Sequence, residues 1–221
     1  MSMPVISLVI FLLTSLILIA MVQIHLFEIA FAKLGLTPET SLLLLITTLL
    51  GSGINLRLFE LKTKQSEHLI LLPKRTHLIW ELFQPAKKGK IVVAVNVGGC
   101  LIPVGLSVYF ISLQLIDPIS LLIALVTITA LSYQCSRVIP HVGIGMPLFI
   151  APIVSALLAL LLNPAHAAHL AYVSGVLGVL IGADILRLGD ISRLNAPIAS
   201  IGGAGTFDGI FLTGIIAVLL A

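Results

Sequence analysis

Two aspartates near the C-terminal end have the surroundings of an acid–base pair. Asp184 closes a glycine-containing apolar run, and Asp208 follows the glycine-rich stretch 202–207. Two carboxylates that face each other in a low-dielectric cavity do not readily both ionise, so they share a proton with split pKa values. One can then accept a proton from water while the other protonates a peptide carbonyl oxygen. The same pair equally suits proton coupling in a transporter.

The depth of Asp208 depends on the conformation of the residues before it. A regular helix from Ile198 would place Asp208 ~15 Å inside the membrane at 1.5 Å per residue, well away from Asp184. An extended or re-entrant glycine stretch would instead start the helix near Asp208 and bring both carboxylates to the same side. The residues expected to form this supporting loop are Gly202, Gly203, Gly205 and Gly209.

The elements that must position these residues are membrane helices. The 221-residue chain is 59% hydrophobic and only 10% charged, whereas soluble domains are about one quarter charged. Runs of about 17 to 25 apolar residues cross a bilayer as helix. The sequence therefore predicts an all-α, polytopic transmembrane bundle of about seven spans, with glycine-rich breaks before the last helix. The expected spans are 5–32, 40–56, 91–113, 118–136, 142–162, 165–186 and 198–221.

Lysine and arginine predict the orientation, because short cytoplasmic loops retain them. With seven spans and residues 57–90 inside, every lysine and arginine except Lys33 lies on the cytoplasmic side. The chain then sits in the cell membrane with its N-terminus cytoplasmic. Residues 1–56 hold two spans, 57–90 form a basic cytoplasmic loop, and 91–221 hold the remaining spans with the candidate site.

Within that loop, residues 69–83 combine apolar patches with lysines and Trp80. Such a segment can lie on the headgroup surface. A short hairpin whose charges only fix the topology is the alternative.

The histidines indicate a functional site less strongly than the two aspartates do. His25 and Glu28 share a helix face and suit a structural pair, and His166 and His169 share another face. A zinc site at the second pair would need a ligand from His25 or Glu28 across the bundle. We expect these histidines to be interfacial and expect no metal. No cofactor is expected either, because the Gly203-Ala204-Gly205 segment lacks the third glycine and the βαβ context of a dinucleotide fingerprint.

The last two spans resemble the GxGD-type intramembrane aspartyl proteases, the group that includes presenilin, signal peptide peptidase and the prepilin peptidases. Asp184 and Asp208 match their span order and direction, and the C-terminal half also looks like a family of uncharacterised bacterial and archaeal membrane proteins. The resemblance implies a hydrolase with both aspartates catalytic. Thr206 and Phe207 separate the glycines from Asp208, however, and Ala183 stands where presenilin-like enzymes usually have tyrosine.

Three classes of function therefore remain open. An intramembrane protease would take a transmembrane peptide as substrate. A proton-coupled transporter would use the breaks at 51–53, 98–99 and 202–205 to form a midplane cavity. A non-catalytic membrane or assembly subunit would pair Asp184 with Arg187 or Arg193 and use Asp208 as a helix cap. The expected partners are membrane lipid and, depending on the class, a peptide or other membrane subunits; the net charge of +3 is a topology signal and predicts no nucleic-acid binding.

Overall fold

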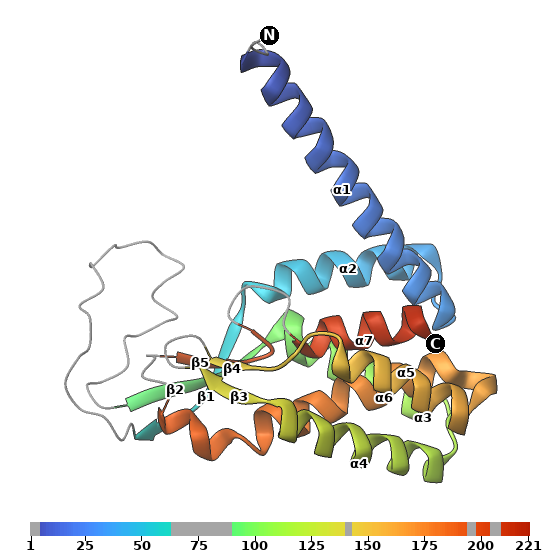
Figure 1. Cartoon of the computed structure of the whole chain (residues 1–221), viewed down its shortest axis with the longest axis vertical. Coiled ribbons are helices and arrows are strands. Elements are labelled where there is room, and N and C mark those ends of the chain that lie inside the picture. Colours follow the sequence, from blue (N-terminus) through green and yellow to red (C-terminus); the bar gives the residue numbers. More distant parts are fainter. Residues whose placement is uncertain (1–4, 63–89, 140–142, 194–197, 204–208) are drawn as a thin grey trace.

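The protein is a bundle of apolar helices with a small β-sheet at one end, which we call the sheet end (Figure 1). The computed structural model describes residues 5–62, 90–139, 143–193, 198–203 and 209–221. The α-helices are α1 (Val5–Lys33), α2 (Pro38–Ser52), α3 (Ile102–Ser112), α4 (Pro118–Cys135), α5 (Ile150–Leu162), α6 (Ala167–Val179) and α7 (Gly209–Leu220). The π-helical segments are η1 (Val97–Leu101) and η3 (Leu180–Ile185), and the 3-10 turns are η2 (Pro164–His166) and η4 (Leu188–Arg193).

The all-α prediction missed the sheet. Three strands, β1 (Asn55–Lys62), β2 (Lys90–Asn96) and β5 (Ile198–Ile201), pair in the order β1-β2-β5, antiparallel and then parallel. A separate two-stranded hairpin joins β3 (Arg137–Ile139) to β4 (Gly143–Gly145). The central strand β2 is buried on both faces and rich in β-branched residues, so its composition resembles that of a membrane helix.

Several predicted spans are shorter as helices than the sequence indicated. The second ends at Ser52 and the fifth begins only at Ile150. The third begins as β2, and the last begins as β5 before α7 starts at Gly209. Ile198–Ile201 is a strand, so the last span does not begin as a regular helix at Ile198. Residues 69–83 of the predicted surface loop lie outside the described residues.

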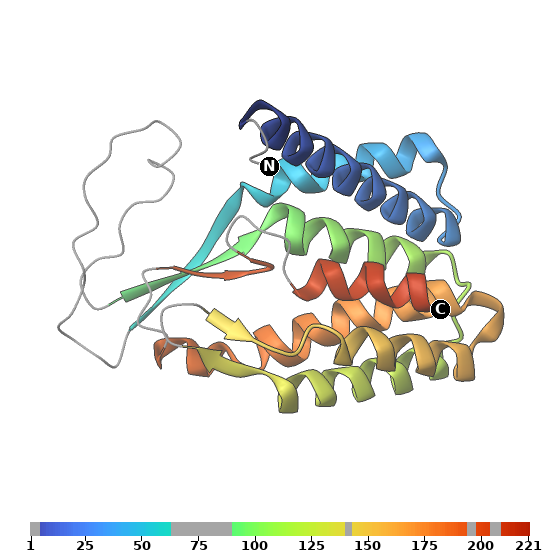
Figure 2. The same ribbon diagram turned by 45° about the horizontal axis from the view of Figure 1, so that its top comes forward.

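The middle of the bundle is α6, which packs against α3, α4, α5 and α7. Leu170, Val173 and Val176 on this helix are fully buried, and so is Tyr172 to within 1%. Glycines allow the close approach: a Cβ added at Gly178 would meet the side chain of Ile128 on α4 at 2.6 Å. Figure 2 shows α3, α4, α5, α6 and α7 running alongside one another away from the sheet.

Membrane insertion is consistent with the lengths of three helical stretches. Leu12–Lys33, Pro118–Cys135 and Pro164–Ile185 are long and apolar enough to cross a bilayer. The α2, η1–α3, α5 and α7 helices are apolar but shorter, so the number of spans stays a prediction. The first helix is apolar and packs into the core near its end through Ala30 and Phe31, and its N-terminal half extends away from the other helices (Figure 1).

Candidate functional site

Three helix ends meet where the sheet joins the bundle. The chain passes from α2 into β1, from β2 into η1 and α3, and from β5 toward α7. Because the three strands pair side by side, they hold these three connections side by side as well. Of the three glycine-rich breaks that the sequence indicated, 51–53, 98–99 and the described part of the third, 202–203, are thereby brought to one place, which we call the glycine junction.

Backbone contacts at the glycine junction leave no room for side chains. A Cβ at Gly98 would collide with the Thr48 carbonyl oxygen of α2, and a Cβ at Gly99 would collide with the Gly202 carbonyl oxygen. Gly202 and Gly203 have φ values of +82° and +87°, a left-handed conformation that glycine adopts without steric cost. The breaks therefore pack tightly against one another.

Asn96 is the polar centre of this junction and is completely buried. Its Oδ1 accepts a hydrogen bond from the Gly99 amide at 2.7 Å, and its Nδ2 donates to the Ser52 carbonyl oxygen at 2.6 Å and to Asn55 Oδ1 at 3.2 Å. One amide side chain thus satisfies backbone groups at the end of α2 and at the start of η1, which would otherwise be costly to bury.

The same network reaches the segment before α7 through Ser200. Its hydroxyl lies 2.5 Å from Asn55 Oδ1 and 2.8 Å from the Gly203 carbonyl oxygen, and it donates to one of these acceptors at a time. Asn55 therefore links β1, β2 and β5 at the edge of the sheet that faces the bundle.

Asp184 lies in η3, the π-helical continuation of α6, and is half-buried. The Leu186 amide donates to the Ile181 carbonyl oxygen at 2.9 Å, which is the wider hydrogen-bond spacing of a π-helix. Such segments often occur at functional sites. Two residues earlier, Gly182 packs against the Thr129 carbonyl oxygen of α4, so this end of α6 is held against α4.

The contact between α6 and α7 gives the depth of the start of α7 relative to Asp184. Gly175 of α6 faces Thr213 of α7, and the two helices run in opposite directions (Figure 1). Four residues back along α7, Gly209 is level with Val179 on α6. Asp184 is five residues further toward the sheet end, or ~7.5 Å along the axis at 1.5 Å per residue. Asp208 and Gly205 lie outside the described residues.

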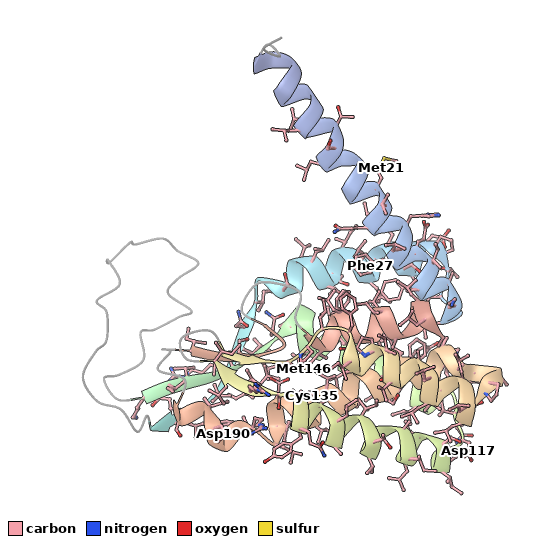
Figure 3. The ribbon with its side chains drawn as sticks, viewed as in Figure 1. Met21, Phe27, Asp117, Cys135, Met146 and Asp190 are labelled. Atoms are coloured by element: carbon pink, nitrogen blue, oxygen red, sulfur yellow. The ribbon has the colours of Figure 1, made fainter. Side chains whose placement is uncertain are left out.

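Arg187 makes its ion pair with Asp190, at 3.1 Å between Nη1 and Oδ2. The same guanidinium donates to the backbone carbonyl oxygens of Tyr133 and Ser136 and to the Ser136 hydroxyl, and it lies 4.2 Å from the centre of the Tyr133 ring. Arg187 therefore caps the C-terminal end of α4. Asp190 lies near this end of the bundle, while Asp117 lies at the opposite end (Figure 3).

His25, His166 and His169 are at the end of the bundle opposite the sheet. His25 Nδ1 lies 3.4 Å from Glu28, so the predicted pair forms. The rings of His166 and His169 are 5.9 Å apart, and His169 also packs edge-on against Phe110 at 5.0 Å. Among the residues that the structure describes, no group of three or more histidine, cysteine, aspartate or glutamate side chains is arranged to hold a metal ion.

Sequence reasoning missed the polar residues of the glycine junction. Asn55, Asn96 and Ser200 are separated by up to 145 positions, and only the sheet brings them together. One signal was present: Asn96 is a strongly polar residue inside an apolar run, directly before Val97 and the glycine pair. An amide at such a position needs buried partners.

A family model described as a protein of unknown function (DUF1614) matches residues 49–220. The match begins in the last turn of α2 and includes the sheet, both π-helical segments and α7, whereas α1 lies outside it. No curated protein and no solved structure matched the chain.

Proposed function

Because this chain belongs to the DUF1614 family, whose description names no activity, we propose a function from the site itself: Asp184 and Asp208 form an acid–base pair that hydrolyses peptide bonds within the membrane. The observation that carries the proposal is the extended strand β5 before α7. It allows the last helix to begin near Asp208, ~7.5 Å from Asp184 along the helix axis rather than deeper in the membrane.

The proposed chemistry follows from one shared proton. The ionised carboxylate takes a proton from water, and the water oxygen forms a bond to the peptide carbonyl carbon. The protonated carboxylate gives its proton to the carbonyl oxygen. When the resulting tetrahedral intermediate collapses, the C–N bond breaks and a proton passes to the leaving amine. The π-helical turn at Asp184 and the tight packing of Gly202 at the glycine junction support this role, because they hold the backbone at Asp184 and at the end of β5.

A cleavage assay tests the proposal. The full chain would be reconstituted in liposomes with single-span peptides that carry a different label at each end. We expect Asp184→Asn and Asp208→Asn each to lower the cleavage rate by about 100-fold or more, the usual range for loss of a general acid or base. Asp117→Asn is the matched control, because it removes a carboxylate at the opposite end of the bundle and keeps a capping side chain. Equal cleavage by all three variants would rule out the pair as catalyst.

Proton-coupled transport is a second candidate, favoured by the meeting of the three glycine breaks at one place. In this conformation they are closely packed, so transport would require them to separate. Liposomes that contain a pH-sensitive dye distinguish the two functions. Proton uptake that depends on both aspartates, without peptide cleavage, would favour the transporter.

The sheet end is proposed to face the cytoplasm, on the basis of the lysine and arginine distribution. Gly189 at the sheet end and Gln114 at the other end are both exposed. In a chain whose two native cysteines are replaced by alanine, we expect Gln114→Cys to react with an impermeant maleimide added outside cells. Gly189→Cys should react only after the cells are opened, and the reverse pattern would invert the topology.

A further inference from the structure

A groove of about 230 Å³ lies between α1 and α2, at the end of the bundle opposite the sheet. Its walls include Ile24, Phe27 and Glu28 of α1 and Glu39, Leu42 and Leu45 of α2. Figure 3 labels Phe27 where α1 passes close to α2 and α7, and its ring lies 5.6 Å from that of Phe211 on α7. The groove is thus anchored to the bundle through an aromatic contact.

The acidic and apolar residues of the lining lie at overlapping depths. Glu39 is in the first turn of α2, next to the α1–α2 connection; Glu28 and Leu42 lie about one turn further from it, and Leu45 and Ile24 about two to two and a half turns. At 1.5 Å per residue, Glu39 and Leu45 are ~9 Å apart along the axis. That distance is comparable to the depth from the headgroup layer into the outer part of the hydrocarbon core.

The charges near the groove are predominantly negative. The Glu28 side chain is 48% exposed and its neighbour is His25, while Glu39 is exposed at a helix N-terminus, which favours a negative charge. Lys33, at the end of α1, directs its Nζ to the carbonyl oxygens of Val218 and Leu219, at 3.4 and 3.2 Å, and so caps α7.

We propose that this groove binds a phospholipid whose headgroup ends in a primary ammonium, as in phosphatidylethanolamine. The ammonium donates N–H bonds to Glu28 and Glu39, and an acyl chain covers Ile24, Leu42 and Leu45. The cavity is smaller than a pocket that encloses a whole drug-sized ligand, which suits a lipid held at its headgroup and upper chain. A quaternary ammonium has no N–H and is bound by aromatic cages, whereas a single aromatic ring, Phe27, lines this groove. Net anionic headgroups are repelled.

Native mass spectrometry of the purified full chain tests the proposal, with phosphatidylethanolamine, phosphatidylcholine and phosphatidylglycerol of identical chains added in equal amounts. We expect phosphatidylethanolamine to be retained about tenfold over each of the others, which is the effect of one charge-assisted hydrogen bond. In the double variant Glu28→Gln and Glu39→Gln this preference should fall to about twofold or less. Asp117→Asn, a carboxylate at the same end but outside the groove, should keep it.

The readout is a ratio between lipids within each variant, so a general loss of stability does not change it. Equal retention of phosphatidylcholine would overturn the proposal, because N–H donation would then be irrelevant. An unchanged preference in the double variant would also overturn it. A third contrary result is displacement of phosphatidylethanolamine by Mg²⁺ alone, which would make the two carboxylates a cation site. The lipid site is independent of the proposed acid–base pair, because its test measures no cleavage.

Discussion

The side-chain amide of Asn96 donates a hydrogen bond of 2.6 Å to the backbone carbonyl oxygen of Ser52, across 44 positions of sequence. This bond joins the last turn of α2 to the end of β2. Because the Asn96 Oδ1 also receives the Gly99 amide, one side chain fixes the helix end, the strand and the π-helical turn that follows it.

Asn96→Ala should destabilise the protein, because it leaves the Ser52 carbonyl and the Gly99 amide without this partner in a buried place. We expect a loss of about 1–3 kcal/mol in the free energy of unfolding, the typical cost of an unsatisfied buried group. Denaturation in detergent measures it. Asn163→Ala is the matched control, since the half-buried Asn163 makes a bond of 3.5 Å to Leu115. A loss no larger than the control's would show that the Asn96 bonds contribute little.

Gly99→Ala should be poorly tolerated, because its Cβ would collide with the Gly202 carbonyl oxygen. Overpacking of this kind costs about 1–3 kcal/mol, and more when backbone must move. Gly105→Ala in α3 is the control, because a Cβ there meets no atom within 4 Å. It should raise stability by about 0.5–1 kcal/mol, since glycine disfavours a helix interior. Thermal unfolding of both variants tests the close contact; similar melting temperatures would contradict it.

Arg187→Ala should cost more than Asp190→Asn. The arginine side chain donates to two backbone carbonyl oxygens at the end of α4 as well as to Asp190, and loss of such bonds costs about 1–3 kcal/mol. Asp190 is 28% exposed, and removal of a partly exposed ion pair costs about 1 kcal/mol or less.

A double-mutant cycle on Arg187 and Asp190 separates the two contributions. If the coupling energy between Arg187 and Asp190 equalled the whole loss of unfolding free energy in Arg187→Ala, the hydrogen bonds of Arg187 to the end of α4 would contribute nothing to stability.

The stability of the folded protein should depend on pH through Asp117, at the N-terminal end of α4. The Ser120 amide, and then its hydroxyl, hold the pKa of the Asp117 carboxyl below its usual value by hydrogen bonding to the charged form. A lowered pKa contributes stability above the ordinary aspartate pKa of about 4, and this contribution disappears as the pH falls through the lowered value.

The melting temperature of the wild type should therefore exceed that of Asp117→Ala at neutral pH, and the gap should close below about pH 4. Asp117→Asn provides the control, because asparagine also caps helices but does not titrate. The melting temperature of Asp117→Asn should stay above that of Asp117→Ala through the same pH range. A wild-type advantage that stayed constant in acid would contradict the role of the carboxylate.

The sequence by itself predicted the apolar, mostly helical character of the protein and its longest helices. Long apolar runs predicted α1, α4 and α6 near their observed bounds, since hydropathy and length depend only on local composition. The helix start at Pro118 also has a local cause, because Asp117 caps it and proline fits the first helical position. Asp184 lies in η3, the continuation of α6, where the sequence predicted the end of the sixth span.

The tertiary structure alone decided the sheet and the glycine junction. Ile91–Val95 has the hydropathy of a membrane helix, and it is a strand because β1 and β5 supply hydrogen-bond partners on both sides. Asn55, Asn96 and Ser200 form a network only after that pairing aligns them. Hydrogen-bond partners distant in sequence have no local signature, so composition and spacing identify the apolar helices, while the arrangement of their ends depends on which segments pair in the folded chain.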